Sequence, residues 1–308
     1  MTVIHLYRRK FIIDVRGYYK MATVKDFKND VKPNWCPGCG DFSVQSAIQR
    51  AAANIGLEPE QLAIVSGIGC SGRISGYIRA YGFHGIHGRS LPIAQGVKVA
   101  NKELTVIAAG GDGDGFAIGI AHTIHAIRRN IDMTYIVMDN QIYGLTKGQT
   151  SPRSDLGFVT KSTPKGSVES PLSIMEMALS AGATFVAQGF SSDIKELTEI
   201  IQAGINHKGF SLINVFSPCV TYNKINTYEW FRSGLVKTSK IDNYNPTDRN
   251  QAMQEIMKHK GLLTGVIYHD QDRKCYRELI PHLDKKSLKE LELKISEDEF
   301  NGLIKEFM

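Results

Sequence analysis

The chain has 308 residues, of which 42% are hydrophobic and 22% charged, with 29 glycines, five cysteines and a formal net charge of +6. This composition excludes a disordered chain and a disulfide scaffold, and no apolar run approaches the roughly 18 residues of a membrane helix. Because five cysteines cannot all pair, we expect a reducing compartment and a cytoplasmic protein.

Residues 1–20 form a basic N-terminal segment. Five basic residues stand against the single acid Asp14, so the segment alone carries a charge of +4. It lacks the apolar run of about 7 to 15 residues found in secretory signals, although its Arg-rich composition is also typical of transit peptides. Since Met21 opens a sequence typical of a domain start, we interpret residues 1–20 as a non-structural extension.

From residue 41 to residue 216, segments with helical periodicity alternate with short, wholly apolar segments. The first helix is expected over 42–55, with Asp41 as its N-cap and Gly56 at its end. Further helices are expected over 90–100, 116–129, 171–181 and 192–206, and strands over 62–66, 105–109, 133–138, 184–190 and 210–216. This alternation predicts an α/β fold, a parallel sheet with helices on both faces, whose ligands bind beyond the carboxyl ends of the strands.

The last third of the chain differs in composition, because charged residues of both signs are frequent there. We therefore place a boundary after residue 236, between a domain over 21–236 and a charged, helical C-terminal segment over 237–308. A helix is expected near 288–295. No motif in this segment indicates a chemical role.

Four of the five cysteines lie in loops at expected element ends. Cys36 and Cys39 form a Cys-Pro-Gly-Cys turn before the first helix, and Cys70 and Cys219 each follow a strand. Thiolates from such loops can bind one metal centre. An iron–sulfur cluster is favoured because its ligands can be dispersed, but structural zinc and unligated thiols stay open. Cys275 lies in the charged segment and is interpreted as a bystander.

The window 61–102 contains no acidic residue but five basic residues and eight glycines. Backbone N–H groups and cations in such a segment can approach phosphate closely. Its Gly67-Ile-Gly-Cys-Ser-Gly72 run matches the dinucleotide fingerprint, but the acid expected about 20 residues later is absent, so a nicotinamide dinucleotide is not predicted. Since the basic charge is local, it does not indicate nucleic acid.

The most informative motif is Gly110-Gly-Asp112-Gly-Asp114-Gly115 at the end of an expected strand. Asn140 follows Asp112 by 28 residues, at the end of the next strand. One strand–helix–strand unit spans that distance, so the two side chains are expected to converge. Carboxylate and amide oxygens suit Mg²⁺, whose remaining positions can go to phosphate, and the glycines with the following helix N-terminus suit a diphosphate.

The residues from Gly111 to Gly113 followed by Asn140 resemble the thiamine-diphosphate motif. With the Cys36–Cys39 turn, the Gly67-Ile-Gly-Cys-Ser run and Cys219, the chain resembles the β subunits of 2-oxoacid:ferredoxin oxidoreductases over about residues 21–236. The segment from Asn140 to Pro152 is the most specific part, and the similarity is greatest to bacterial 2-oxoglutarate enzymes. The resemblance implies the thiamine-diphosphate-binding fold and oxidative decarboxylation of a 2-oxoacid, with transfer of the acyl group to coenzyme A and of electrons to ferredoxin.

The same resemblance implies roles for individual residues. Magnesium would be held by Asp112, Asn140 and the main-chain oxygen of Ile142. One [4Fe–4S] cluster would be ligated by Cys36, Cys39, Cys70 and Cys219. Thiamine diphosphate would be lined by Ile68, Gly69, Cys70, Ser71, His87, Gly113, Asp114, Gly144 and Leu145. Arg73 and His87 would be catalytic, with Arg73 either on the substrate carboxylate or paired with cofactor phosphate or cluster.

The family supplies the carboxylate that acts on the aminopyrimidine ring from an α subunit, and this chain offers no convincing candidate. We therefore expect a heteromer with that subunit, and no activity of the chain alone. A basic patch near the cluster would steer an acidic ferredoxin. Three alternatives stay open: pyruvate as substrate, a non-redox thiamine enzyme with structural zinc, and a non-catalytic metal-binding assembly subunit using His122 and His125. No nucleic acid or membrane partner is expected.

Overall fold

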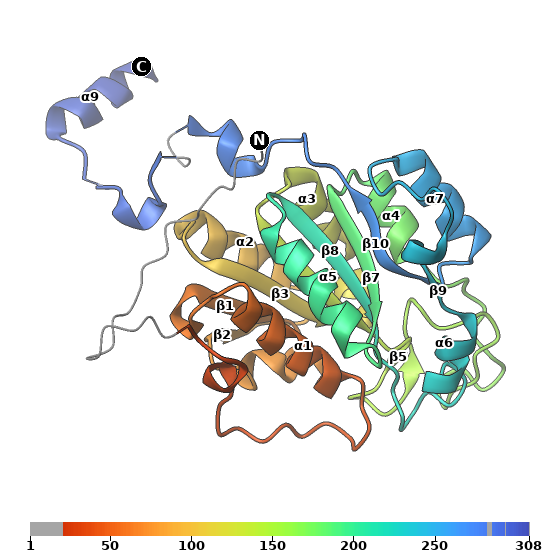
Figure 1. Cartoon of the computed structure of the whole chain (residues 1–308). Coiled ribbons are helices and arrows are strands. Elements are labelled where there is room, and N and C mark those ends of the chain that lie inside the picture. The colour runs from red at the N-terminus through yellow and green to blue at the C-terminus, as the bar shows by residue number, and fades with distance from the viewer. Residues whose placement is uncertain (1–20, 282–284, 293, 308) are drawn as a thin grey trace.

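A computed structural model describes residues 21–281, 285–292 and 294–307, so the predicted N-terminal extension, residues 1–20, lies outside the described residues. The centre of the fold is one mixed sheet of eight strands. These are β1 (Leu62–Ser66), β2 (Tyr81–His84), β3 (Thr105–Gly111), β4 (Met133–Asp139), β7 (Phe185–Phe190), β8 (Phe210–Phe216), β9 (Val236–Lys237) and β10 (Leu263–His269). Their order is β2-β1-β3-β4-β8-β7-β10-β9, and only the β7–β10 pair is antiparallel (Figure 1). A separate antiparallel ribbon joins β5 (Ile142–Tyr143) to β6 (Gln149–Thr150).

Helices cover both faces of this sheet. The longer ones are α1 (Asp41–Asn54), α2 (Ser90–Ala100), α3 (Ile120–Arg129), α4 (Ile174–Ser180), α5 (Ile194–Asn206), α6 (Tyr228–Gly234), α7 (Arg249–Lys258) and α9 (Glu297–Glu306). Short turns are η1 (Val24–Phe27), η2 (Pro59–Gln61), η3 (Ser71–Gly76), η4 (Asp114–Ile118), η5 (Thr238–Lys240), η6 (Tyr276–Leu279) and η7 (Leu288–Glu290). Helices α1 and α5 pack on one face, and α2, α3, α4 and α7 pack on the other (Figure 1).

The apolar strands are buried because both of their faces meet helices. In β1, Leu62 and Ile64 contribute to the core under α1 and α5, while Ala63 and Val65 contribute to the core under α2 and α3. A strand buried on both faces has no polar side, which is why its sequence shows no alternation. The predicted α/β fold with helices on both faces is confirmed.

Several predicted elements differ from the observed ones. Asp41 is not the N-cap of α1, because Gly40 occupies that position and the Asp41 carboxylate instead accepts a hydrogen bond of 2.6 Å from Ser217 Oγ. The helix predicted over 116–129 starts as the π-helical turn η4 and continues as α3. The helix predicted over 171–181 is confined to α4. Strand β2 was not predicted, since its four residues are all exposed.

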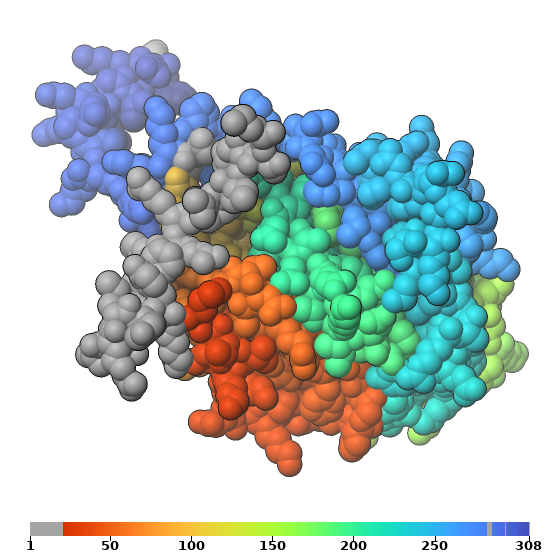
Figure 2. All heavy atoms as spheres, viewed as in Figure 1, coloured from red at the N-terminus to blue at the C-terminus, as the bar shows by residue number. Residues whose placement is uncertain are grey.

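The charged C-terminal segment contributes to the sheet. Strand β10 pairs with β7, and its Leu263 and Ile267 are fully buried, so residues beyond 236 are not only a helical tail. Of the helix predicted over 288–295, the described residues show only the turn η7. Helix α9 follows, has no buried residue and lies away from the sheet (Figures 1 and 2).

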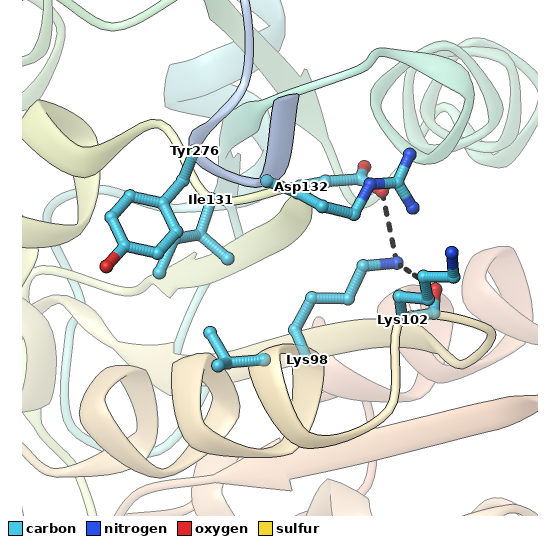
Figure 3. A pocket seen from close by; sticks show the side chains of 7 residues that line it. Lys98, Lys102, Ile131, Asp132 and Tyr276 are labelled. Atoms are coloured by element: carbon cyan, nitrogen blue, oxygen red, sulfur yellow. Dashed lines mark hydrogen bonds and ion pairs between the residues drawn. The ribbon is translucent and has the colours of Figure 1, made fainter. Parts of the chain in front are cut away.

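Part of this segment packs on α2, as Figure 3 shows. Lys98 Nζ forms an ion pair of 3.1 Å with Asp132 and donates to the main-chain oxygen of Lys102, while Tyr276 lies beside Ile131. The pocket between these side chains is too small for an organic ligand. Within the described ranges, no helix has the length and apolar content needed to cross a membrane.

A chain of hydrogen-bonded polar groups, buried except for the half-buried His269, lies at the edge of the sheet where β4, β7 and β8 begin. His269 Nε2 is 3.2 Å from His207 Nδ1, and His207 Nε2 is 2.8 Å from Thr184 Oγ1, which donates to Asn130 Oδ1. Because the single hydroxyl hydrogen of Thr184 goes to Asn130, Thr184 Oγ1 accepts from His207 Nε2. His207 Nδ1 then carries no hydrogen and accepts from His269 Nε2. Burial, and then the neighbouring His269, lowers the pKa of His207 to about 4, so this ring is neutral at pH 7.

Candidate active site

The loops that follow β1, β3, β4 and β8 meet at the opposite edge of the sheet. Main-chain hydrogen bonds join neighbouring loops: Gly67 N donates to Ala109 O at 3.0 Å, and Ser217 N donates to Asp139 O at 2.9 Å. Because β3 and β4 are adjacent and parallel, Asp112 and Asn140 follow neighbouring strand ends. The two residues therefore lie at adjacent strand ends, as expected from their spacing, and the convergence of their side chains stays a prediction.

Two buried carboxylates dominate the electrostatics of this edge. Asp112 is 1% exposed and Asp139 is fully buried, and Arg153 is their shared cation, with its Nε 3.0 Å from Asp139 Oδ2. Ser151 Oγ donates to Asp112 Oδ2. Burial first, and then the charge of Asp139, raises the pKa of Asp112 to about 7, against the lowering effects of Ser151 and Arg153. Two carboxylates with one guanidinium leave a negative site.

That negative site fits a divalent cation. Asp139 Oδ1 is buried and has no hydrogen-bond partner among the described residues. Asn140 Oδ1 faces back toward its own loop, where it accepts from Ile142 N at 3.1 Å. Asp112, Asn140 and the carbonyl of Ile142 offer only oxygen donors, the set that Mg²⁺ prefers. The residues present therefore suit the predicted magnesium ion.

Asp114 connects the two glycine-rich loops after β1 and β2. Its Oδ1 accepts from Ile68 N at 2.9 Å and from Gly88 N at 2.8 Å, and His87 Nδ1 lies 2.8 Å from the same oxygen. A β-carbon on Gly67 would lie 1.9 Å from Asp114 Oδ2, so only glycine fits there. Asp114 thus holds the loops that carry several predicted cofactor-lining residues, a positioning role that sequence reasoning did not assign.

Tyr143 completes the wall between the Asp112 and Asn140 loops. Its hydroxyl donates to Gly113 O at 3.2 Å, and a β-carbon on Gly113 would lie 2.2 Å from the Tyr143 ring. Burial, followed by the charges of Asp112 and Asp114, raises the pKa of Tyr143. The predicted site residues omitted Tyr143, although it lies in the segment identified as most specific.

The predicted cluster ligands gather beside this wall. The sulfurs of Cys70 and Cys219 each lie 3.6 Å from the β-position of Gly144, so they are at most twice that distance apart. Cys39 interacts electrostatically with both. Cys36 interacts with Cys70 and is exposed. Burial, and then the charge of Asp41, raises the pKa of Cys70 to about 11 and that of Cys39 further.

The cysteines are placed so that one iron–sulfur cluster could take thiolates from separate loops. In the part of the chain that the structure describes, no three His, Cys, Asp or Glu side chains are close enough to hold one metal ion. The cluster, and zinc as its alternative, therefore stay predictions.

Aromatic packing fixes the cysteine turn against the Cys70 loop. Trp35 Nε1 donates to Cys70 O at 2.7 Å, and its ring meets Phe42 and Tyr77 edge to face, with centroids 5.2 and 4.9 Å away. Trp35 directly precedes Cys36, so this contact sets the position of the turn. Sequence reasoning missed the role of Trp35, although a buried tryptophan with an indole N–H needs an acceptor.

The remaining predicted residues surround this edge or lie outside it. Arg73 is exposed in η3, and within the described residues its guanidinium has no hydrogen-bond or ion-pair partner. Leu145 is 56% exposed and follows Gly144. His122 and His125 lie on α3, and no third ligand joins them in the described ranges.

Comparison with known proteins gives two family matches that together cover most of the chain. The family described as "Thiamine pyrophosphate enzyme, C-terminal TPP binding domain" matches residues 67–215, which include every loop of this edge except the cysteine turn and the Cys219 loop. A second family, described as the C-terminal part of the beta subunit of pyruvate ferredoxin oxidoreductase, matches residues 219–285 and begins at Cys219.

Individual relatives agree with these matches. A "2-oxoacid:ferredoxin oxidoreductase subunit beta" from Saccharolobus solfataricus is 44% identical over 253 residues, covering 82% of each chain. A "2-oxoglutarate oxidoreductase subunit KorB" from Mycobacterium tuberculosis is 46% identical over 199 residues, covering 65% of this chain and 53% of that protein. A solved 2-oxoglutarate:ferredoxin oxidoreductase from Magnetococcus marinus superposes with a TM-score of 0.85 at 36% identity, covering 92% of this chain and 96% of that one.

Proposed function

The chain belongs to the β subunits of the thiamine-diphosphate-dependent 2-oxoacid:ferredoxin oxidoreductases, and on this premise we propose that its substrate is 2-oxoglutarate. The reaction would convert 2-oxoglutarate and coenzyme A to succinyl-CoA and CO₂. The C–C bond to the carboxylate breaks, a C–S bond forms, one proton is released, and two electrons pass singly to two oxidised ferredoxins.

One observation carries the redox part of the proposal. Gly144 lies beside the sulfurs of Cys70 and Cys219, and the adjacent Tyr143 donates to Gly113 in the Asp112 loop. The predicted cluster ligands and the predicted magnesium loop are thus in contact through two consecutive residues. This contact supports an electron path from the cofactor to a cluster within one chain.

The residues have separable roles in this proposal. Asp112, Asn140 and the Ile142 carbonyl would bind Mg²⁺, which holds the diphosphate, while Asp114 keeps the loops at Ile68 and Gly88 in place. Thiamine diphosphate supplies the carbanion stabilisation that decarboxylation of a 2-oxoacid requires. Cys36, Cys39, Cys70 and Cys219 would hold one [4Fe–4S] cluster.

The proposal also requires an α subunit. The family resemblance implies that the carboxylate that acts on the aminopyrimidine ring belongs to an α subunit. The buried carboxylates after β3 and β4 have other roles in this proposal: Asp112 would bind Mg²⁺, Asp114 accepts from two loop amides, and Asp139 pairs with Arg153. We therefore propose that the partner subunit supplies the carboxylate for the aminopyrimidine ring and that ferredoxin accepts the electrons.

The choice of 2-oxoglutarate over pyruvate rests on relatives and on one side chain. Relatives named for 2-oxoglutarate include the Mycobacterium protein and the Magnetococcus enzyme, which was solved with 2-oxoglutarate bound. Arg73 supports this choice, because a free guanidinium can bind the second carboxylate, which pyruvate lacks. Pyruvate is the second candidate, because the family that matches residues 219–285 is named for it.

The test is a substrate comparison with the chain co-expressed with its α subunit under anaerobic conditions. We expect 2-oxoglutarate to reduce ferredoxin with a kcat/KM above that of pyruvate, and the chain alone to be inactive. Arg73→Ala should raise KM for 2-oxoglutarate and leave that for pyruvate unchanged. A higher kcat/KM for pyruvate would overturn the substrate, and a colourless, zinc-containing complex would overturn the redox reaction.

A further inference from the structure

A buried asparagine joins the Cys219 loop to the Asn140 loop. Asn223 is 2% exposed and lies in the segment between β8 and α6. Its main-chain N donates to Cys219 O at 3.2 Å, and its side-chain Nδ2 donates to Asn140 O at 3.1 Å. One residue is therefore bonded both to a predicted cluster ligand and to a predicted magnesium ligand.

The side chain of Asn223 uses its full hydrogen-bonding capacity. The second Nδ2 hydrogen goes to Asn226 Oδ1 at 3.0 Å, and Oδ1 accepts from Ile225 N at 3.1 Å and Asn226 N at 2.9 Å. An amide can make four such bonds, and all four are present. A side chain held by four hydrogen bonds has one orientation, so Asn223 fixes the position of the Cys219 loop relative to the Asn140 loop.

A second buried asparagine extends the connection. Asn226, 1% exposed, donates from Nδ2 to Asp155 Oδ2 at 3.1 Å, in the loop that follows β6. The start of the Cys219 loop is fixed separately by the bond from Ser217 N to Asp139 O. Asn223 fixes the other end of the loop, so Cys219 lies between two anchors on the Asn140 side.

We propose that Asn223 is a positioning residue that sets the separation between the cysteine cluster site and the magnesium loop. This proposal rests on the proposed function, because only then does that separation govern a reaction step. Without the Asn223 bonds, Cys219 can move relative to Asn140 while each site keeps its own ligands. Electron transfer between the two bound groups then slows, since its rate falls steeply with distance.

The test uses the complex with the α subunit and two variants. Asn223→Asp keeps the two acceptor bonds to Ile225 N and Asn226 N but places oxygen against Asn140 O and Asn226 Oδ1, whereas Asn223→Ala removes all four bonds. Asn130→Ala is the matched control, because Asn130 is also 1% exposed and bonded but lies at the opposite edge of the sheet. The readouts are iron content, thiamine diphosphate affinity, unfolding temperature, and the rates of cluster reduction by 2-oxoglutarate and by dithionite.

Both Asn223 variants should keep the iron content and the cofactor affinity of the unsubstituted complex, while reduction by 2-oxoglutarate slows several-fold, because electron transfer slows as the two groups move apart. Reduction by dithionite, which bypasses the cofactor, should be unchanged. Asn130→Ala should lower the unfolding temperature without slowing reduction. Unchanged reduction by 2-oxoglutarate in both Asn223 variants, or equal slowing in Asn130→Ala, would overturn the proposal. If the unsubstituted complex shows no reduction by 2-oxoglutarate, the proposed function fails instead.

Discussion

Replacement of Asp112 by asparagine should stabilise the metal-free protein and abolish its response to magnesium. Asp112 is buried beside Asp139, and its folded-state pKa of about 7 lies about three units above the ordinary value of 3.8. Because the pKa is raised, ionisation of Asp112 opposes folding above pH 4, and the penalty is complete above pH 7. At 1.36 kcal/mol per unit, it amounts to at most about 4 kcal/mol.

The side chain introduced by Asp112→Asn has nearly the same shape as aspartate and can still accept from Ser151, so the substitution removes charge without leaving a cavity. In EDTA at pH 8, we expect the unfolding temperature of the complex to rise by several degrees. Magnesium with thiamine diphosphate should then stabilise the unsubstituted complex but not Asp112→Asn. Differential scanning calorimetry measures both effects. Asp132→Asn is the control, because Asp132 is partly exposed and paired with Lys98.

Two results would refute this reasoning. If Asp112→Asn unfolds at a lower temperature than the unsubstituted complex in EDTA, the Asp112 charge does not destabilise the metal-free fold. An undiminished response of the variant to magnesium and thiamine diphosphate would show that Asp112 does not bind the ion.

Three further predictions concern other parts of the chain. Gly67→Ala should abolish thiamine diphosphate binding, because its β-carbon would meet the Asp114 carboxylate at 1.9 Å. Gly76→Ala is the control and should bind the cofactor normally, because open space surrounds Gly76. Isothermal titration calorimetry measures both affinities, and equal affinities would contradict the role of Asp114. Cys219→Ser should lower the iron content, because it removes one of the four predicted thiolate ligands, whereas Cys275→Ser should not. Equal iron in both variants would contradict a cluster at Cys219. The pKa of His207 is lowered to about 4 in the folded protein, so as the pH falls the imidazole is protonated in the unfolded chain before it is protonated in the folded one. The free energy of unfolding should therefore fall by about 2 to 3 kcal/mol between pH 6.5 and pH 4. In urea unfolding, His207→Asn should lose less free energy of unfolding over that pH range than the unsubstituted protein. The same pH dependence in both proteins would contradict a neutral, buried His207 ring.

The central sheet could be predicted because its strands are wholly apolar and its helices periodic. Strand β10 escaped prediction because it lies in a charged segment and only Leu263 and Ile267, among its core-facing positions, are fully buried. Strand β2 escaped because an exposed edge strand has no buried face to shape its sequence. Both errors arise where pairing with a neighbouring strand, rather than local composition, determines the conformation.

The candidate site could be predicted where the residue type itself carries the chemistry, as for Asp112, Asn140 and the cysteines. The supporting residues could not. Arg153, Asn223 and Trp35 act through partners 14 to 83 residues away in sequence, and no local pattern reveals such contacts. The prediction that Asp114 lines the cofactor stays a prediction, and the bonds from loop amides to its carboxylate could not be predicted because only the fold brings those amides to it.

The most direct measurement of the account is the electron paramagnetic resonance of the αβ complex after addition of 2-oxoglutarate and coenzyme A without ferredoxin. We expect about four iron and four sulfide per β chain, and a reduced-cluster signal that forms only when 2-oxoglutarate is present. Asp112→Asn should keep the iron and develop the signal with dithionite but not with 2-oxoglutarate. Absence of iron, or a 2-oxoglutarate signal of full size in Asp112→Asn, would contradict a cluster reduced from a cofactor bound at Asp112.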